Sequence, residues 1–183
     1  ATKLLRFHWQ QSTASSDLLL ESAVNGYPNS QYRLGTNLLR GEFTHTDRKK
    51  GLNWILNAAQ SGFVFAQYRL ARELLDKRYV EYDREKAKRW LINAANEGHF
   101  RAMRDLIAIC IEDNNEIQAV NYLTLAMEKD ARHPDLWLSQ SKLLLRNGNI
   151  KQAKQALANA KQYALQRNWS TIKIEVFEQS INQ

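Results

Sequence analysis

An internal repeat of 36 residues constrains this chain more than any other feature of its sequence. Residues of one type recur at that interval: Gly26, Gly62 and Gly98; Leu34, Leu70 and Leu106; Tyr32 and Tyr68; Trp54 and Trp90. A period between 20 and 50 residues is typical of repeat architectures, in which each unit is stabilised by packing against its neighbours. We therefore expect an array of similar units rather than one globular core.

Each unit is predicted to contain two helices. In the second unit, apolar residues recur at three- and four-residue spacing from Tyr68 to Leu75 and again from Ala87 to Ala95. Asp83 can cap the second helix, because its carboxylate can accept a hydrogen bond from a backbone N–H of the first turn. The repeat thus predicts an all-α fold, a right-handed α-solenoid (superhelix) of antiparallel helix pairs.

The repeat period changes along the chain and divides it into parts. Beyond residue 100 the period becomes shorter by two residues, as the interval between Ala119 and Ala153 shows. We expect one continuous solenoid domain with four parts. These are an N-terminal segment without a clear pattern at 1–15, the 36-residue repeats at 16–99, the 34-residue repeats at 100–168 and a C-terminal capping helix at 169–183.

The two periods resemble two related repeat families. The first is carried by Ala58-Ala59, Gly62, Ala66-Gln67-Tyr68, Leu70-Ala71, Asp83, Lys86-Ala87, Trp90, Ala94-Ala95 and Gly98. These residues resemble the Sel-like repeat (SLR), a bacterial and eukaryotic relative of the tetratricopeptide repeat (TPR). The segment from Phe100 to Ala164 is similar to tetratricopeptide repeats proper, with Ser141 where a glycine is usual. The resemblance implies an α-solenoid that serves as an adaptor or assembly platform.

Composition leaves the cellular location open. The single cysteine, Cys110, cannot form an intrachain disulfide, so it departs from the disulfide-stabilised members of the family. No apolar run reaches the roughly 18 residues of a membrane-spanning helix. A first residue other than methionine, Ala1, fits either a shortened chain or a mature chain without its signal peptide. Because many bacterial members of the family are exported, the resemblance favours a periplasmic or exported location over the cytoplasm.

No group of residues in the sequence indicates catalysis or metal binding. His8, His45, His99 and His133 are widely separated along the chain, so no two of them have the four-residue spacing of a zinc site. Cys110 falls where the repeat places a buried apolar side chain, which favours a structural thiol. Nucleophile elbows and glycine-rich phosphate loops are absent from the sequence. We therefore expect no enzymatic activity, no metal or other cofactor and no small-molecule substrate.

Two functions compete. Stacked helix pairs leave a concave groove lined by the first helix of each pair, which favours a non-catalytic scaffold or adaptor for protein–protein interaction. The alternative is a nucleic-acid (RNA) binding helical-repeat protein, suggested by the net charge of +7. A repeat that reads bases should vary its polar residues at fixed places, whereas Tyr32 and Tyr68 are simply repeated. This difference favours a protein partner.

The register predicts which residues face the groove. In tetratricopeptide-like pairs these are places two, five, nine and thirteen of each unit. The candidate partner-binding residues are Tyr32, Arg40, Phe65, Tyr68, Arg72, Arg101, Arg104, Lys142 and Arg146. Basic groups beside aromatic rings favour an acidic or amphipathic partner segment, with Arg72, Arg101 and Arg104 at the centre of the site. The alternative is that the tyrosines pack between helices and the arginines bond to neighbouring acids.

Overall fold

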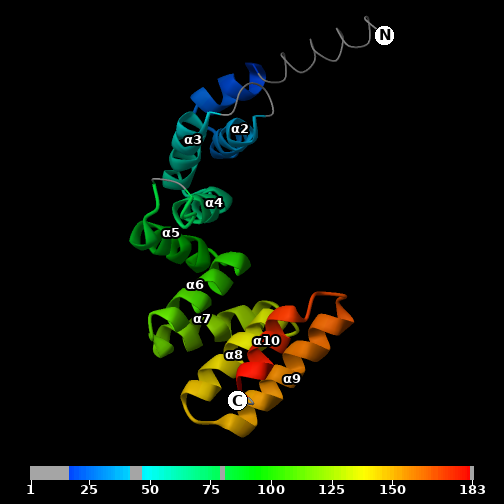
Figure 1. Cartoon of the computed structure of the whole chain (residues 1–183). Helices are drawn as coiled ribbons and strands as arrows, with labels where there is room; N and C mark the ends of the chain where they lie inside the picture. The colour runs from blue at the N-terminus through cyan, green and yellow to red at the C-terminus, as the bar shows by residue number, and fades with distance from the viewer. Residues whose placement is uncertain (1–16, 42–46, 79–80, 182–183) are drawn as a thin grey trace, which may run out of the picture. The chain divides into compact units, whose positions relative to one another are not determined.

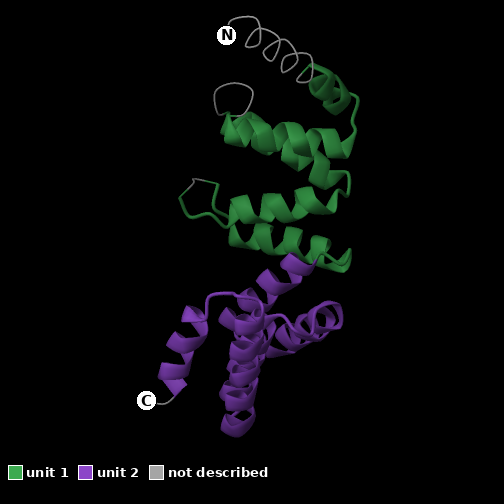
Figure 2. Cartoon of the chain, turned by 90° about the vertical axis from the view of Figure 1, so that its right-hand side faces the viewer, with its two compact units in different colours: residues 1–99 green, residues 100–183 purple. Residues whose placement is uncertain are grey.

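The computed structural model describes residues 17–41, 47–78 and 81–181, and the N-terminal segment at 1–15 lies outside them. Within the described residues, helices are the only regular secondary structure, which confirms the all-α fold. The chain divides into two compact units, Ala1–His99 (unit 1) and Phe100–Gln183 (unit 2), coloured separately in Figure 2.

Unit 1 is a stack of helix pairs (Figure 1). After a helical segment at 17–24 come α2 (Pro28–Arg40), α3 (Arg48–Gln60), α4 (Val64–Leu74) and α5 (Arg84–Asn96). Helix α2 packs against α3, α4 packs against α5, and α3 also contacts α4. Both helices of the second pair begin 36 residues after their counterparts in the first pair, so the sequence period is the period of the helix pairs.

Unit 2 repeats the helix pair at the shorter period. Its helices are α6 (Phe100–Glu112), α7 (Glu116–Lys129), α8 (Pro134–Arg146), α9 (Ile150–Gln166) and α10 (Ile172–Ile181). Helix α6 packs against α7 and α8 against α9, and the second pair begins one shorter period after the first. Helix α10 packs on the last pair through Ile174, Phe177 and Ile181, while its Ile172 and Val176 side chains are exposed.

The expected helix ends are present in unit 1. The Asp47 carboxylate accepts a hydrogen bond from the Lys50 backbone N–H at 3.0 Å, and Asp83 caps α5 in the same way through Lys86 at 2.9 Å. Gly62, which follows the end of α3, has a φ of +83°, a left-handed conformation that side chains other than glycine rarely adopt. The cap predicted at Asp83 is therefore confirmed, and Asp47 begins α3 in the same way.

Small residues bring the helices of a pair close together. A Cβ atom on Gly35 of α2 would lie 2.7 Å from the Gly51 carbonyl oxygen and 2.7 Å from the Ile55 side chain of α3. The second pair has Ala71 and Ala87 at the equivalent places, both fully buried. Close packing of this kind leaves no room for larger side chains.

Each unit contains a core of its own. The unit 1 core comprises Ile55, Ala58, Ala59, Ala66 and Leu70. The core of unit 2 around α8 to α10 comprises Leu138, Leu157, Ala160, Ala164 and Ile174. Trp90 packs against the first of these cores but remains partly exposed.

Candidate functional site

The predicted partner-binding residues of unit 1 lie on α2 and α4, the first helices of the two pairs. We call the surface formed by the predicted places on α2 and α4 the first-helix face. Arg40, Phe65 and Arg72 are exposed, whereas Tyr32 and Tyr68 are half-buried. The exposed side chains are therefore accessible to a partner. Each tyrosine lies partly on the surface and partly packed against neighbouring side chains.

The tyrosines belong to a row of aromatic rings. The Tyr32 and Phe63 ring centroids are 5.4 Å apart, and those of Phe63 and Phe65 are 5.7 Å apart. The His99 ring lies 4.4 Å from that of Tyr68 and 5.6 Å from that of Phe65, which it meets edge-on. The row holds Phe65 in a fixed orientation although its side chain is 57% exposed.

Sequence reasoning missed two members of this row. Among functional roles, it considered His99 only as a metal ligand, and it gave Phe63 no role. Both residues follow a glycine that ends a second helix, and Tyr27 occupies the same place one unit earlier. An aromatic ring at the same place 36 residues apart was therefore the signal that could have identified the row.

The predicted residues of unit 2 lie on α6 and α8, and most of them have partners within the chain. Arg101 is exposed. Arg146 donates a hydrogen bond to the Ile111 carbonyl oxygen at 2.5 Å, and the Lys142 ammonium lies 5.5 Å from the centroid of the Phe177 ring. These contacts hold the two basic side chains against neighbouring helices; Lys142 is half-buried, whereas Arg146 is exposed.

Arg104 takes part in a polar cluster with the next helix pair. Its guanidinium forms an ion pair with Asp135 at 2.6 Å and lies 3.2 Å from His133 Nε2. His133 caps α8 and is only 3% exposed, between the rings of Phe100 and Trp169. Burial, followed by the nearby Arg104 charge, lowers the pKa of His133 below its ordinary value. The sequence expectation that an arginine bonds to a neighbouring acid thus holds for Arg104.

The described residues include few groups that could bind a metal ion or react. Across the described ranges, no three His, Cys, Asp or Glu side chains are grouped so that they could hold a metal ion. Cys110 is fully buried, as expected for a structural thiol. None of the helices described is both long and apolar enough to cross a lipid bilayer.

Helix pairs repeated at two closely similar periods, with an aromatic and basic face on their first helices, define the chain as an α-solenoid of the tetratricopeptide-like class. The sequence profile of the Sel1 repeat family matches residues 28–63 and 64–99. Residues 28–99 therefore form two Sel1 repeats, which confirms the first of the two resemblances drawn from the sequence.

Two solved structures support the same assignment. A protective antigen present in uropathogenic Escherichia coli strains, which displays an SLR fold, is 26% identical, with a TM-score of 0.66 over 80% of this chain and 32% of that one. A Sel1 repeat protein from Oxalobacter formigenes is 25% identical, with a TM-score of 0.70 over 80% of this chain and 44% of that one. The chain thus spans less than half the length of either protein. No curated protein matches the sequence.

Proposed function

We propose that the chain is a non-catalytic scaffold or adaptor that binds a segment of a partner protein on its first-helix face. The Sel1 repeats support this proposal, since such repeats typically mediate protein interactions.

The main support for the proposal is the exposed Phe65 ring, which contacts the His99 ring edge-on in the aromatic row. Rigid aromatic side chains beside arginines are the usual centres of binding energy at protein interfaces. Arg72 lies seven residues after Phe65, two turns along the same helix, so both side chains occupy one side of α4. An apolar side chain of the partner would contact Phe65, and a carboxylate would bind Arg72.

The other predicted residues take two roles in this proposal. Arg40, which is exposed on α2, contacts the partner directly. Tyr32 and Tyr68 border this surface and keep its shape through their ring contacts. The candidates of unit 2 would form a contact surface of that unit: Arg101, Arg104, Lys142 and Arg146. Replacing Arg104 would disturb its ion pair with Asp135, so exposed residues make the better test.

The test compares the capture of partner proteins by immobilised chains. We expect Phe65→Ala and the pair Arg40→Glu with Arg72→Glu each to lose the captured partner while helicity and Tm stay unchanged. The matched control is Lys151→Glu with Lys154→Glu, which makes the same charge change at two exposed residues of α9. Equal capture by all variants would show that the first-helix face is not the interface.

The nucleic-acid alternative has a separate test. An interaction with RNA must weaken steeply between low and high salt, because bound cations are released from the phosphates. We expect filter binding at two salt concentrations to show no specific RNA complex. Tight binding with a steep salt dependence would replace the scaffold proposal.

A further inference from the structure

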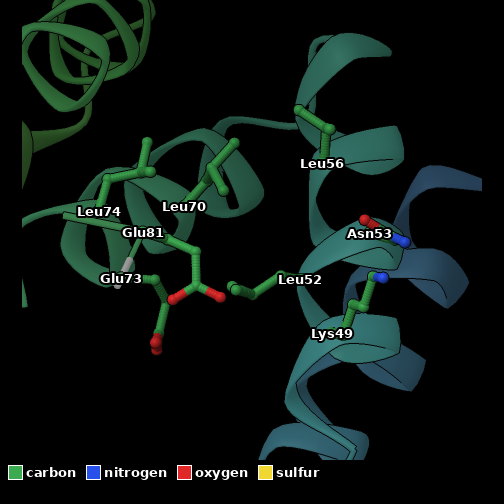
Figure 3. A pocket seen from close by; sticks show the side chains of 8 residues that line it. All are labelled: Lys49, Leu52, Asn53, Leu56, Leu70, Glu73, Leu74 and Glu81. Atoms are coloured by element: carbon green, nitrogen blue, oxygen red, sulfur yellow. The ribbon is translucent and has the colours of Figure 1, made fainter. Parts of the chain in front are cut away.

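Unit 1 has an apolar groove that is separate from the first-helix face. It consists of two cavities, one of about 350 Å³ between α3 and α4 and one of about 530 Å³ that extends to α5. Both are lined by Leu56, Leu70 and Leu74, so the cavities form one continuous groove with an apolar floor. Figure 3 shows the first cavity, with Leu52 pointing from α3 towards α4 and the Glu81 carboxylate turned towards it.

The two second helices of unit 1 form the walls of the groove. One wall consists of Lys49, Leu52, Asn53 and Leu56 of α3. The other consists of Lys86, Arg89, Trp90 and Asn93 of α5. Both sets have the spacing of residues on one helix face, and each extends over about two turns, or roughly 10 Å. A straight segment of similar length can therefore contact both walls and the floor at the same time.

The charged side chains that line the groove are Lys49, Lys86 and Arg89 on the two walls, and Glu73 and Glu81 beside them. Glu81 lies 3.9 Å from Arg48, and Lys86 pairs with Asp83 at 3.1 Å. The Glu73 carboxylate is neutralised by Arg48 and by Arg69, each at 2.8 Å. Lys49 on one wall and Arg89 on the other are exposed, and neither has an ion-pair partner within the described part of the chain. An apolar floor with an unpaired positive charge on each wall is complementary to an apolar segment that carries carboxylates on both sides.

We propose that this groove binds a short amphipathic helix of a partner protein, two to three turns long, with leucine-like side chains on one face and carboxylates beside them. The leucine-like side chains would pack on Leu56, Leu70 and Leu74, as in other helix-in-groove complexes. The flanking carboxylates would bind Lys49 and Arg89. A flat lipid surface does not fit, since the leucines lie between two helices. The site is independent of the first-helix face and needs no partner there.

An NMR titration with a designed peptide tests the proposal. The probe is a twelve-residue helical peptide with leucines on one face and glutamates beside them. Added to the isotope-labelled chain, it should shift the Trp90 indole N–H signal and the backbone amides of α3, α4 and α5. The Trp90 signal is assigned from the spectrum of Trp90→Phe. A peptide with serine in place of leucine should cause no shifts.

Charge reversal separates the proposed site from general attraction to a basic protein. Lys49→Glu with Arg89→Glu should weaken binding several-fold to about tenfold, the effect of losing two exposed ion pairs. Lys151→Glu with Lys154→Glu, which gives the same net charge, should leave the affinity unchanged, as should Phe65→Ala on the first-helix face. Equal weakening by both charge reversals, or shifts outside α3 to α5, would overturn the proposal.

A second copy of the chain is the other possible occupant. In that case the same signals would shift when the labelled protein is diluted without any peptide, and the proposal would be wrong.

The experiments test the two proposed interfaces independently. Loss of peptide binding here would leave partner capture through Phe65 and Arg72 intact, and the reverse would also hold.

Discussion

A glutamine repeated at the same place in both Sel1 repeats shows how one side chain joins two helix pairs. The Nε2 atom of Gln31 donates a hydrogen bond to the Ala23 carbonyl at 3.2 Å, and that of Gln67 donates to the Ala59 carbonyl at 3.3 Å. Both glutamine Oε1 atoms are buried and have no hydrogen-bond partner in the structure. The site therefore requires a donor at this position and gains nothing from the acceptor.

We predict that Gln67→Glu destabilises the chain more than Gln67→Met does. The glutamate removes the donor and places a carboxylate against a carbonyl oxygen at a residue that is 7% exposed, which should cost more than about 1–3 kcal/mol. Methionine loses one hydrogen bond, about 0.5–1.5 kcal/mol, but also removes the unpartnered oxygen. Urea unfolding of both variants provides the measurement, and equal losses would contradict this explanation.

His133 makes the stability of unit 2 depend on pH. Its pKa is lowered in the folded protein by burial and by Arg104, so the unfolded chain binds the proton more readily. The contribution of neutral His133 to the free energy of unfolding should therefore be fully present above the ordinary histidine pKa of about 6.5. It should decrease as the pH falls below that value, by at most about 1.4 kcal/mol per pH unit. Asp135 and Asp130, which also act on His133, oppose the shift without reversing it.

The variant His133→Asn checks this prediction, because asparagine can also cap a helix but does not titrate. Thermal unfolding between pH 7.5 and about pH 5 should show a smaller loss of Tm for the variant than for the parent chain. Asp130 does not interfere, since its pKa is lowered by the hydrogen bond from Arg167 and its contribution is lost only below the ordinary aspartate range. The same acid sensitivity in both chains would assign the effect to another group.

At the level of helices, the sequence predicted the features that depend on residues close together in the chain. The caps at Asp47 and Asp83 and the left-handed Gly62 follow from residues within one turn of each helix end. The internal partner of Arg104 could not be predicted in the same way, because Asp135 lies on α8, 31 residues later. Whether a basic residue on the first helix of a pair is available to a partner thus depends on the packing between helix pairs.

The groove between α3 and α5 was also beyond prediction from the sequence. Leu70 and Leu74 follow the helical period and were expected in the packed interior. Leu70 is indeed only 6% exposed, yet together with Leu56 it also forms the floor of an open groove. The apolar period identifies the face that turns inward, but the separation of the second helices decides how completely that face is covered.

The contact of Gly35 with Gly51 predicts that Gly35→Ala destabilises the first helix pair. Alanine in place of a glycine within a helix should gain about 0.5–1 kcal/mol from its higher helix propensity. Its Cβ would lie 2.7 Å from the Gly51 carbonyl, and overpacking of this kind costs typically about 1–3 kcal/mol. The expected net effect is a loss of stability in urea unfolding. A gain would show that α2 and α3 separate easily enough to admit a methyl group.

At the level of the whole molecule, the two units have separate cores, and stability should vary along the chain. In repeat proteins, stability is approximately the sum of the stability of each repeat and of its contacts with immediate neighbours. The unit 1 core around Ile55 and Leu70 and the unit 2 core around Leu138 and Leu157 share no residues. A change in one core should therefore affect its own unit more strongly than the other unit.

We predict that Leu70→Ala tests both the register and this local stability. Loss of the side chain from the unit 1 core should cost about 2–5 kcal/mol. Amide hydrogen exchange should then accelerate more strongly in α3, α4 and α5 than in α8 and α9, because local opening in a repeat array spreads first to the nearest helices. A loss below about 0.5 kcal/mol would contradict the core role of Leu70. Equal acceleration in both units would show instead that the chain unfolds as one cooperative array.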